Sequence, residues 1–437
     1  MLTGCISGTD AEGHSDVEGE VEIFSWWTDW GELEALETVL GMYTDEYPQA
    51  TVINATVTYA DKAREELRKR MVEGLPPSTF QANTGADLLN NWVLINAKDD
   101  AESKVENLQE IADERGWLEA FDPHALEAAT YKGKLWALPV NIHRINSLVI
   151  RADLFAKYEL SVPKTIEELY ALCERIKDDK AIQAEAPEGE RMACLGLGNQ
   201  WDWTLSQMTF EMILPAMTSA GYYKQFWSGE KSGDSKEIIE AMEVALYLYC
   251  GGTDTSDCRA TSYFNADVDE IDWGEGVFKV AEKKAMMAAM GDWAKGYLES
   301  RNQRLGKDFD IVPFPGSEAT FVFTSDTFPL PKGAPNRAGA LALLETFASV
   351  EAQVAFNKLK GSIPARNAAD LDMSQFDSTS LRTLQDYHQA EKVLALSGLL
   401  GTTVMPFLAS ELKASMHRGS TEIIRNYVRA NYDLIAR

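Results

Sequence analysis

The sequence lacks the features that mark membrane-spanning and nucleic-acid-binding proteins. No run of residues approaches the roughly 18 consecutive apolar positions that a spanning helix needs, and the Ala- and Met-rich stretch at 285–290 is far too short. Basic residues are outnumbered, with 41 Lys and Arg against 68 Asp and Glu, so the net charge is −27. Such a charge repels a phosphate backbone or an anionic membrane surface. We therefore expect no nucleic-acid partner.

Signatures of the common enzyme classes are also missing. The phosphate-binding loop and the GxSxG, HExxH and GxGxxG patterns do not occur, and the 5 histidines are scattered without the spacing of metal ligands. Carboxylates are abundant, so a glycoside hydrolase with a pair of acidic groups remains the enzymatic alternative. We expect a protein that is not an enzyme and that uses no cofactor or metal.

Cysteine is scarce, and no CxxC spacing occurs among the 5 residues. Cys5 ends the quartet L-T-G-C, which resembles a bacterial lipobox, so we expect Cys5 to carry a lipid anchor. Four cysteines remain for two bridges. Cys250 and Cys258 flank the polar turn GGTDTSD, and we predict that they pair. Cys173 either pairs with Cys194 or stays a buried free thiol on an apolar helix face.

Strands and helices alternate in the first part of the chain, after a polar tether at residues 1–19. A half-buried strand at 21–27 precedes a helix whose apolar residues at 33, 36, 40, 43 and 47 form one stripe. A strand at 52–58, a charged helix, a short strand near residue 80 and the helix GADLLNNWV follow. This alternation predicts a parallel sheet and an α/β fold.

A second domain is indicated by the length of 437 residues and by the middle of the chain. Apolar strands at 135–140 and 147–151 flank the polar segment NIHRI, where we expect the chain to cross between domains. Thr165 and Glu168 then form the capping box of a new helix. MACLGLG and KKAMMAAMG read as buried strands, and helices dominate from residue 336 onward.

Tryptophan, with 11 residues, gathers where predicted strands end, at 26–27, 201–203 and 293. An indole can lie flat on the apolar face of a pyranose ring, although any one of these rings is as well explained by core packing. Polar neighbours are suited to hold hydroxyl groups; for Glu32 and Lys295, a solvated charge at a helix end is an equal alternative. The polar candidates are Glu32, Gln81, Asn83, Gln200, Asp292 and Lys295.

Four stretches, WWTDWGELEAL, LEAATYKGKLWALPV, GDWAKGY and KGSIPAR, resemble the extracellular solute-binding proteins that serve carbohydrate ABC importers. The resemblance spans essentially the whole chain and is greatest to the glucose-binding branch of that family. It implies a type II periplasmic-binding-protein-like fold, with two α/β lobes and a ligand cleft between them. It also implies a monosaccharide ligand, a membrane permease as partner, and a monomer held at the cell surface or in the periplasm.

The resemblance also assigns binding positions along this sequence. Asn83 departs from it, because a basic residue is expected there, and Lys360 could instead cap a turn. The ligand contacts that the resemblance implies are Trp26, Trp27, Glu32, Gln200, Trp201, Asp292, Trp293 and Lys360. Gln81, Asn83 and Lys295 are added as polar candidates, and the loop TSDTFPLPKG offers Ser325, Asp326 and Lys332, of which we select Asp326.

Lobe boundaries complete the prediction. We expect a tether at 1–19, a first lobe of residues 20–142 and 313–348, and a second lobe of residues 143–312 and 349–437. Binding of another mono- or oligosaccharide, glycoside hydrolysis and surface adhesion are the alternative functions.

Overall fold

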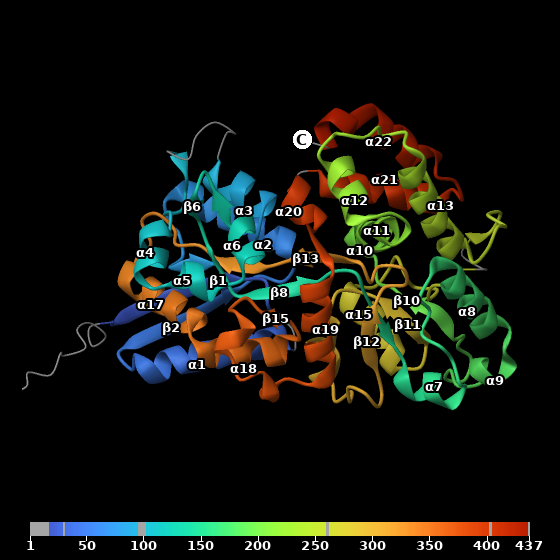
Figure 1. Cartoon of the computed structure of the whole chain (residues 1–437), viewed down its shortest axis with the longest axis horizontal. Helices are drawn as coiled ribbons and strands as arrows, with labels where there is room; N and C mark the ends of the chain where they lie inside the picture. Colours follow the sequence, from blue (N-terminus) through green and yellow to red (C-terminus); the bar gives the residue numbers. More distant parts are fainter. Residues whose placement is uncertain (1–16, 29–30, 95–101, 259–261, 402–403, 436–437) are drawn as a thin grey trace, which may run out of the picture.

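The computed structural model describes residues 17–28, 31–94, 102–258, 262–401 and 404–435. Two α/β lobes lie side by side, and a small set of strands joins them in the middle of the molecule (Figure 1). The α/β fold and the two lobes that we expected are confirmed. Cys5 and most of the predicted tether fall outside the described residues.

The first lobe is built on a parallel sheet in which the central strand is the first of the chain. Its order is β2–β1–β3, and both pairs of neighbouring strands are parallel. Helices follow β1 and β2 along the chain, so the predicted alternation of strand and helix is correct. The strands are β1 (Gly19–Ser25), β2 (Ala50–Thr56) and β3 (Thr79–Phe80). The helices of this lobe are α1 (Glu32–Glu46), α2 (Ala60–Glu73), α3 (Ala86–Leu88), the π-helix η1 (Leu89–Val93), α4 (Gln109–Glu114), α5 (Trp117–Ala120), α6 (Pro123–Ala128), α17 (Arg337–Ala348) and α18 (Val350–Lys360).

Two smaller pieces of β-structure complete this lobe. One is the antiparallel sheet β4–β14–β7, made of β4 (Ala82–Asn83), β14 (Asp326–Phe328) and β7 (Leu138–Pro139). The other is the hairpin of β5 (Thr130–Tyr131) and β6 (Lys134–Leu135). The strand predicted at 135–140 is therefore interrupted, because Trp136 and Ala137 lie between β6 and β7.

The second lobe has a mixed sheet of order β10–β11–β9–β12. Its strands are β9 (Ser147–Ile150), β10 (Ala193–Gly196), β11 (Ala285–Ala289) and β12 (Asp310–Pro313). The strand predicted at 147–151 and the two predicted buried runs correspond to β9, β10 and β11, whereas β12 was not predicted. Its helices include α7 (Ala152–Lys157), α8 (Ile166–Asp178), α9 (Lys180–Gln183), α10 (Trp203–Gln207), the π-helix η4 (Met208–Ile213), α11 (Leu214–Met217), α12 (Ala220–Trp227), α13 (Lys236–Cys250), α15 (Trp273–Ala281), α16 (Ala294–Glu299), α20 (Leu396–Leu400), α21 (Met405–His417) and α22 (Glu422–Ile435).

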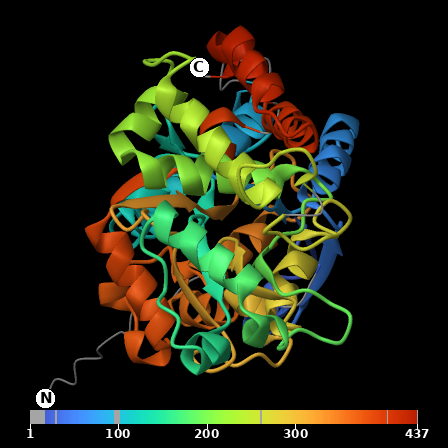
Figure 2. The ribbon, with the colours of Figure 1, turned by 90° about the vertical axis from the view of Figure 1, so that its right-hand side faces the viewer.

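The last helices of the chain return to this lobe. In Figure 2, which looks onto the second lobe, α21 and α22 (red) lie beside the helices from the middle of the chain. Two disulfides also stabilise the lobe. One joins Cys250 to Cys258, as predicted, and the other joins Cys173 to Cys194, so the free-thiol alternative is wrong.

Strands from three parts of the chain meet between the lobes. The sheet has the order β15–β8–β13–β16, and α19 (Ser378–Gln389) covers it. Its strands are β8 (Asn141–Arg144), β13 (Thr320–Thr324), β15 (Ile363–Pro364) and β16 (Glu391–Leu394). The NIHRI segment is thus a buried strand at the crossing point, where we had expected only a polar link.

Two of the predicted lobe boundaries differ from the structure. We placed residues 349–437 in the second lobe, but α18 packs on α1, and Phe356 packs against Trp27 at a tilted angle in the core of the first lobe. We also began the return to the first lobe at residue 313, whereas Val322 in β13 still belongs to the core of the second lobe. The chain returns only at β14, because its partners β4 and β7 belong to the first lobe.

None of the described helices is by itself long and apolar enough to cross a bilayer. Among the helices of the described ranges, only α17 and α18 together reach that length and composition, and they are bent by 71° relative to each other. Both helices bury apolar side chains in the core of the first lobe.

Candidate functional site

Asp326 is the centre of a group of buried polar side chains where the first lobe meets the crossing strands. It lies at the start of β14, and neighbouring strands bring three amides to its carboxylate. Gln81 Nε2 and Asn83 Nδ2 donate to Oδ1 at 2.8 and 3.2 Å, and Asn141 Nδ2 donates to Oδ2 at 2.8 Å. Each carboxylate oxygen can accept more than one hydrogen bond, so Asp326 is held in place and retains capacity for a further donor.

His143 connects this group to the second lobe. The Asn141 amide donates to Nε2 at 3.1 Å, so Nδ1 carries the proton and donates to Asp292 Oδ1 at 2.5 Å. Asp292 follows β11 in the second lobe, and its Oδ2 accepts from the backbone N–H of Arg144 at 2.9 Å. Asp292 and Asp326 are both buried, 3% and 5% exposed. One hydrogen-bonded chain therefore joins a carboxylate of each lobe.

Trp293 provides an aromatic surface beside this chain. Its indole meets the His143 ring edge-on, with centroids 5.4 Å apart, and meets Trp273 in the same manner at 6.5 Å. The ring is only partly buried. Gly291 permits this position, because a Cβ there would lie 2.1 Å from the Trp293 ring. The arrangement joins a flat apolar face to fixed hydrogen-bond acceptors.

Arg64 on α2 extends the polar group on the side of the first lobe. Its guanidinium donates to Asn83 Oδ1 at 3.0 Å, forms an ion pair with Asp87, and covers the Trp26 ring at 4.8 Å. The Trp26 backbone N–H donates to Gln81 Oε1 at 3.2 Å. The positive charge that the resemblance places at position 83 is therefore present nearby, on Arg64.

Two buried hydroxyls beside Asp326 have no hydrogen-bond partner among the described residues. They are Thr84 Oγ1, which follows Asn83, and Thr324 Oγ1, which precedes Ser325 in the crossing strand. The Thr84 N–H donates to Ser325 O at 3.0 Å, so the two threonines lie close together. Buried polar atoms are normally paired, and these hydroxyls are suited to meet a polar ligand or water.

Trp27, Glu32 and Lys360 form a separate group in the first lobe. Trp27 is buried between Phe328 and Phe356. The Lys360 ammonium stands 5.4 Å above its ring and pairs with Glu32 Oε1 at 2.5 Å. These three predicted contacts are thus brought together, but Trp27 serves as a core residue and Lys360 is already paired.

Lys295 makes its polar contacts outside the Asp326 group. Its ammonium binds Asp377 and Ser380 at the start of α19. Burial alone would raise the pKa of Asp377, but the charge and hydrogen bonds of Lys295 outweigh it, and the pKa is lowered. Lys295 therefore anchors α19 to the second lobe.

Gln200 and Trp201 lie on the loop before α10, at the surface of the second lobe. The Trp201 ring packs on Tyr59 of the first lobe, with centroids 4.7 Å apart. Lys62 stands over both rings, 5.1 Å from the centroid of Tyr59 and 5.4 Å from that of Trp201. The predicted pair of residues is therefore near the opposite lobe, while Gln200 is exposed.

Sequence reasoning missed His143, Asn141, Arg64 and Tyr59. The first two lie in the NIHRI segment, whose position at a domain crossing was a usable signal, because a crossing strand must pass the space between two lobes. Arg64 and Tyr59 belong to a charged helix and the loop before it, and nothing in the sequence distinguishes them from solvated neighbours.

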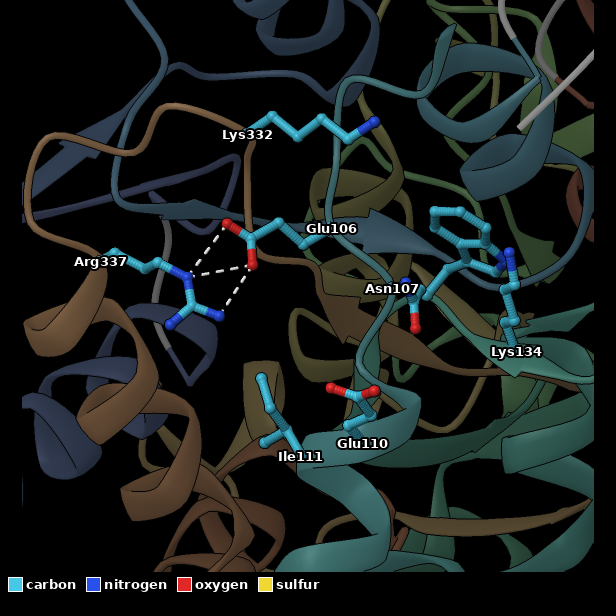
Figure 3. A pocket seen from close by; sticks show the side chains of 8 residues that line it. Glu106, Asn107, Glu110, Ile111, Lys134, Lys332 and Arg337 are labelled. Atoms are coloured by element: carbon cyan, nitrogen blue, oxygen red, sulfur yellow. Dashed lines mark hydrogen bonds and ion pairs between the residues drawn. The ribbon is translucent and has the colours of Figure 1, made fainter. Parts of the chain in front are cut away.

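The structure also has hollows away from this polar group. One of about 540 Å³ lies in the first lobe (Figure 3), where the Arg337 guanidinium and the Glu106 carboxylate form an ion pair at 2.8 Å on its rim. Another, of about 720 Å³, lies in the second lobe beside Asp377. Their linings are mostly polar or charged and include no residue of the interlobe hydrogen-bonded chain, so the polar group at the crossing strands is the candidate site.

Comparison with known families identifies the architecture around this site. The sequence profile of the bacterial extracellular solute-binding proteins matches residues 43–354. The chain belongs to this family. An ABC transporter extracellular-binding protein of unknown character from Pyrococcus horikoshii is 28% identical to this solute-binding protein, over 97% of this chain and 92% of that protein.

More distant relatives of this solute-binding protein carry named ligands. A xylose/arabinose-binding protein from Haloferax volcanii is 22% identical over 86% of this chain and 75% of its own length. A glucose-binding protein from Saccharolobus solfataricus is 22% identical over 80% of this chain and 61% of its own length. Among solved structures, the bacterial solute receptor AcbH superposes with a TM-score of 0.77 at 16% identity, over 96% of this chain and 100% of that chain. At this identity, the similarity to AcbH shows that the two proteins share a fold and nothing further.

Proposed function

We propose that this solute-binding protein is the substrate-binding subunit of an ABC sugar importer. It binds one monosaccharide, glucose, between its lobes and delivers it to the membrane permease. The observation that carries the proposal is the hydrogen-bonded chain from Asp326 through His143 to Asp292, which lies beside Trp293. Closing two lobes on a ligand requires contacts from both, and this chain supplies a carboxylate from each.

The chemistry of the site suits a pyranose. Carboxylates accept hydrogen bonds from sugar hydroxyls, the unpaired threonine hydroxyls can donate or accept, and the Trp293 face can cover the apolar C–H surface of the ring. Relatives named for sugars are binding proteins, which supports binding without turnover.

The choice of glucose rests on the resemblance to the glucose-binding branch. Relatives and structural neighbours are named for different sugars, among them xylose, arabinose, glucose and β-D-galactopyranose. Another mono- or oligosaccharide is therefore the alternative ligand. We also propose that the protein acts outside the cytoplasm as a monomer, held at the membrane by a lipid on Cys5.

Isothermal titration with glucose, galactose, mannose, xylose and maltose tests the proposal. We expect 1:1 binding of glucose by the native protein. Asp292→Asn should weaken it roughly tenfold to a hundredfold, because a charge-assisted hydrogen bond contributes about 1.5–3 kcal/mol. Trp293→Ala should weaken it roughly twofold to tenfold, because an aromatic contact contributes about 0.5–1.5 kcal/mol. Asp234→Asn, at an exposed aspartate of the second lobe, is the matched control and should bind as the native protein does.

Binding of a different sugar alone would keep the receptor function and replace glucose as its ligand. Absence of heat with every sugar, or unchanged affinity in both variants, would overturn the proposed site. Thermal unfolding of each variant shows whether it is folded before it is titrated.

A further inference from the structure

We propose that Tyr59 and Trp201 form an aromatic clasp between the lobes that limits the length of the sugar the site accepts. The clasp encloses a monosaccharide and excludes oligosaccharides that would extend between the two rings. This inference rests on the proposed function and adds a size limit to it.

The clasp is a direct contact between the two lobes. Tyr59 lies on the loop between β2 and α2 of the first lobe, and Trp201 lies on the loop between β10 and α10 of the second. Their ring centroids are 4.7 Å apart. A sugar ring between them would require a separation of about 7–8 Å, because each face keeps a van der Waals contact of about 3.5–4 Å. The two rings in contact therefore leave no space for a further sugar unit.

The clasp is at the solvent edge of the molecule. Tyr59 is 36% exposed and Trp201 is 44% exposed, whereas Trp27 and Trp92 are fully buried in the core. Exposed rings contribute little to a core, so their pairing needs another explanation. The ammonium of the exposed Lys62 stands over both rings and adds a cation–π attraction to each.

The backbone of Tyr59 is strained at this point. Its φ is +73° and its ψ is 124°, a conformation that glycine adopts readily and a residue with a bulky side chain adopts only at a cost. Strain of this kind persists only when surrounding contacts hold it. The conformation directs the Tyr59 ring at the other lobe, and this points to a role for the contact beyond the stability of the first lobe.

A circuit of ring contacts, hydrogen bonds and shared packing connects the clasp to the residues of the candidate site. Trp203 and Trp293 pack against the same hydrophobic cluster, His143 and Asp326 share hydrogen bonds with Asn141, and Arg64 lies one turn of α2 after Tyr59. The circuit runs in order through Trp201, Trp203, Trp293, His143, Asp326, Asn83, Arg64 and Tyr59. Along this circuit, the clasp lies farthest from His143 in β8 and Asp326 in β14.

Titration of Tyr59→Ala with sugars of increasing length tests the clasp. Glucose, maltose and maltotriose are the probes, or xylose, xylobiose and xylotriose if the native protein prefers xylose. We expect the native protein to bind the monosaccharide and to reject the trisaccharide. In Tyr59→Ala the monosaccharide should bind roughly three- to tenfold more weakly, because the aromatic contact between the lobes is lost, and the longer sugars should gain at least tenfold.

Tyr59→Phe keeps the ring and should retain the native length preference, and Phe407→Ala, which removes an exposed ring elsewhere in the second lobe, is the matched control. An identical length preference in Tyr59→Ala and the native protein overturns the clasp alone. Tight binding of trisaccharide by the native protein does the same. A native protein that binds no sugar overturns the proposed function and the clasp together.

Discussion

Glu211 is an acidic side chain inside the core of the second lobe. It lies in the π-helix η4, is 5% exposed, and accepts a hydrogen bond from the Leu396 N–H at 2.6 Å, at the start of α20. Burial raises its pKa from 4.5 to about 7, although the hydrogen bond from Leu396 opposes the shift. A carboxyl group that titrates near neutral pH inside a core makes stability depend on pH.

The folded protein binds this proton more tightly than the unfolded chain does. Protonation of Glu211 therefore makes its full contribution to the stability of the folded protein below about pH 4.5, and this contribution is lost as the pH rises through about 7. Glu211→Gln removes the titration and keeps an acceptor for Leu396. We expect the free energy of unfolding of the variant, relative to the native protein, to rise by about 3 kcal/mol between pH 4.5 and pH 8.

Urea unfolding at a series of pH values measures this difference. Glu188→Gln, at an exposed glutamate of the same lobe, is the control and should run parallel to the native protein. If the Glu211→Gln and native stabilities also run parallel with pH, the carboxyl group does not titrate in this range and the interpretation is wrong.

At this scale, sequence reasoning found part of the candidate site. Gln81, Asn83, Asp292, Trp293 and Asp326 were expected, and the structure brings them to one place. Whether they bind sugar stays a prediction. The connecting residues were not found, because they come from a strand whose polar side chains resemble those of a loop until its partners β13 and β15 are known.

Helix α16 illustrates how elements from different lobes approach each other. It belongs to the second lobe, yet Gly296 faces the backbone of α18 in the first. A Cβ at Gly296 would lie 2.3 Å from the Leu359 carbonyl oxygen and 3.0 Å from that of Lys360. The absence of a side chain is therefore what allows these two helices to touch.

Gly296→Ala should destabilise the protein by about 1–3 kcal/mol, because a methyl group against backbone forces the helices apart. Gly41→Ala in α1 is the matched control, since both glycines lie in helices and a Cβ at Gly41 would meet nothing within 4 Å. That control should gain about 0.5–1 kcal/mol from helix propensity. Urea unfolding of both variants measures the two effects, and equal behaviour would show that the α16–α18 contact can adjust.

Helices and strands whose apolar residues recur with a clear spacing were predicted well. The stripe on α1, the N-cap Thr165 of α8 and the buried strands β10 and β11 occur as expected. Helix α18 was assigned to the wrong lobe, because its amphipathic pattern shows that one face is buried and does not show which core buries it. The same limit applies to β13, whose partners lie far away in the sequence.

The net charge of −27 acts on the molecule as a whole. Like charges repel one another most strongly in the compact state, while the exposed ion pairs that would offset this contribute little. We expect the unfolding midpoint to rise as NaCl is increased from about 10 to 150 mM, which shortens the screening length from about 30 to about 8 Å. Thermal unfolding at a series of NaCl and KCl concentrations measures this midpoint. A midpoint that falls with increasing concentration of both salts would show that attraction between ion pairs outweighs the repulsion.

Both lobes are assembled from distant parts of the chain, and this has a consequence for the order of folding. Tyr43 donates a hydrogen bond to Gly339 O, and Thr79 donates one to Pro329 O, across 296 and 250 positions. A nascent chain that ends before α17 therefore cannot close its first core, and one that ends before α21 cannot close its second. Non-local contacts of this kind slow folding. The protein should stay open to proteases and chaperones until nearly all of it has been synthesised.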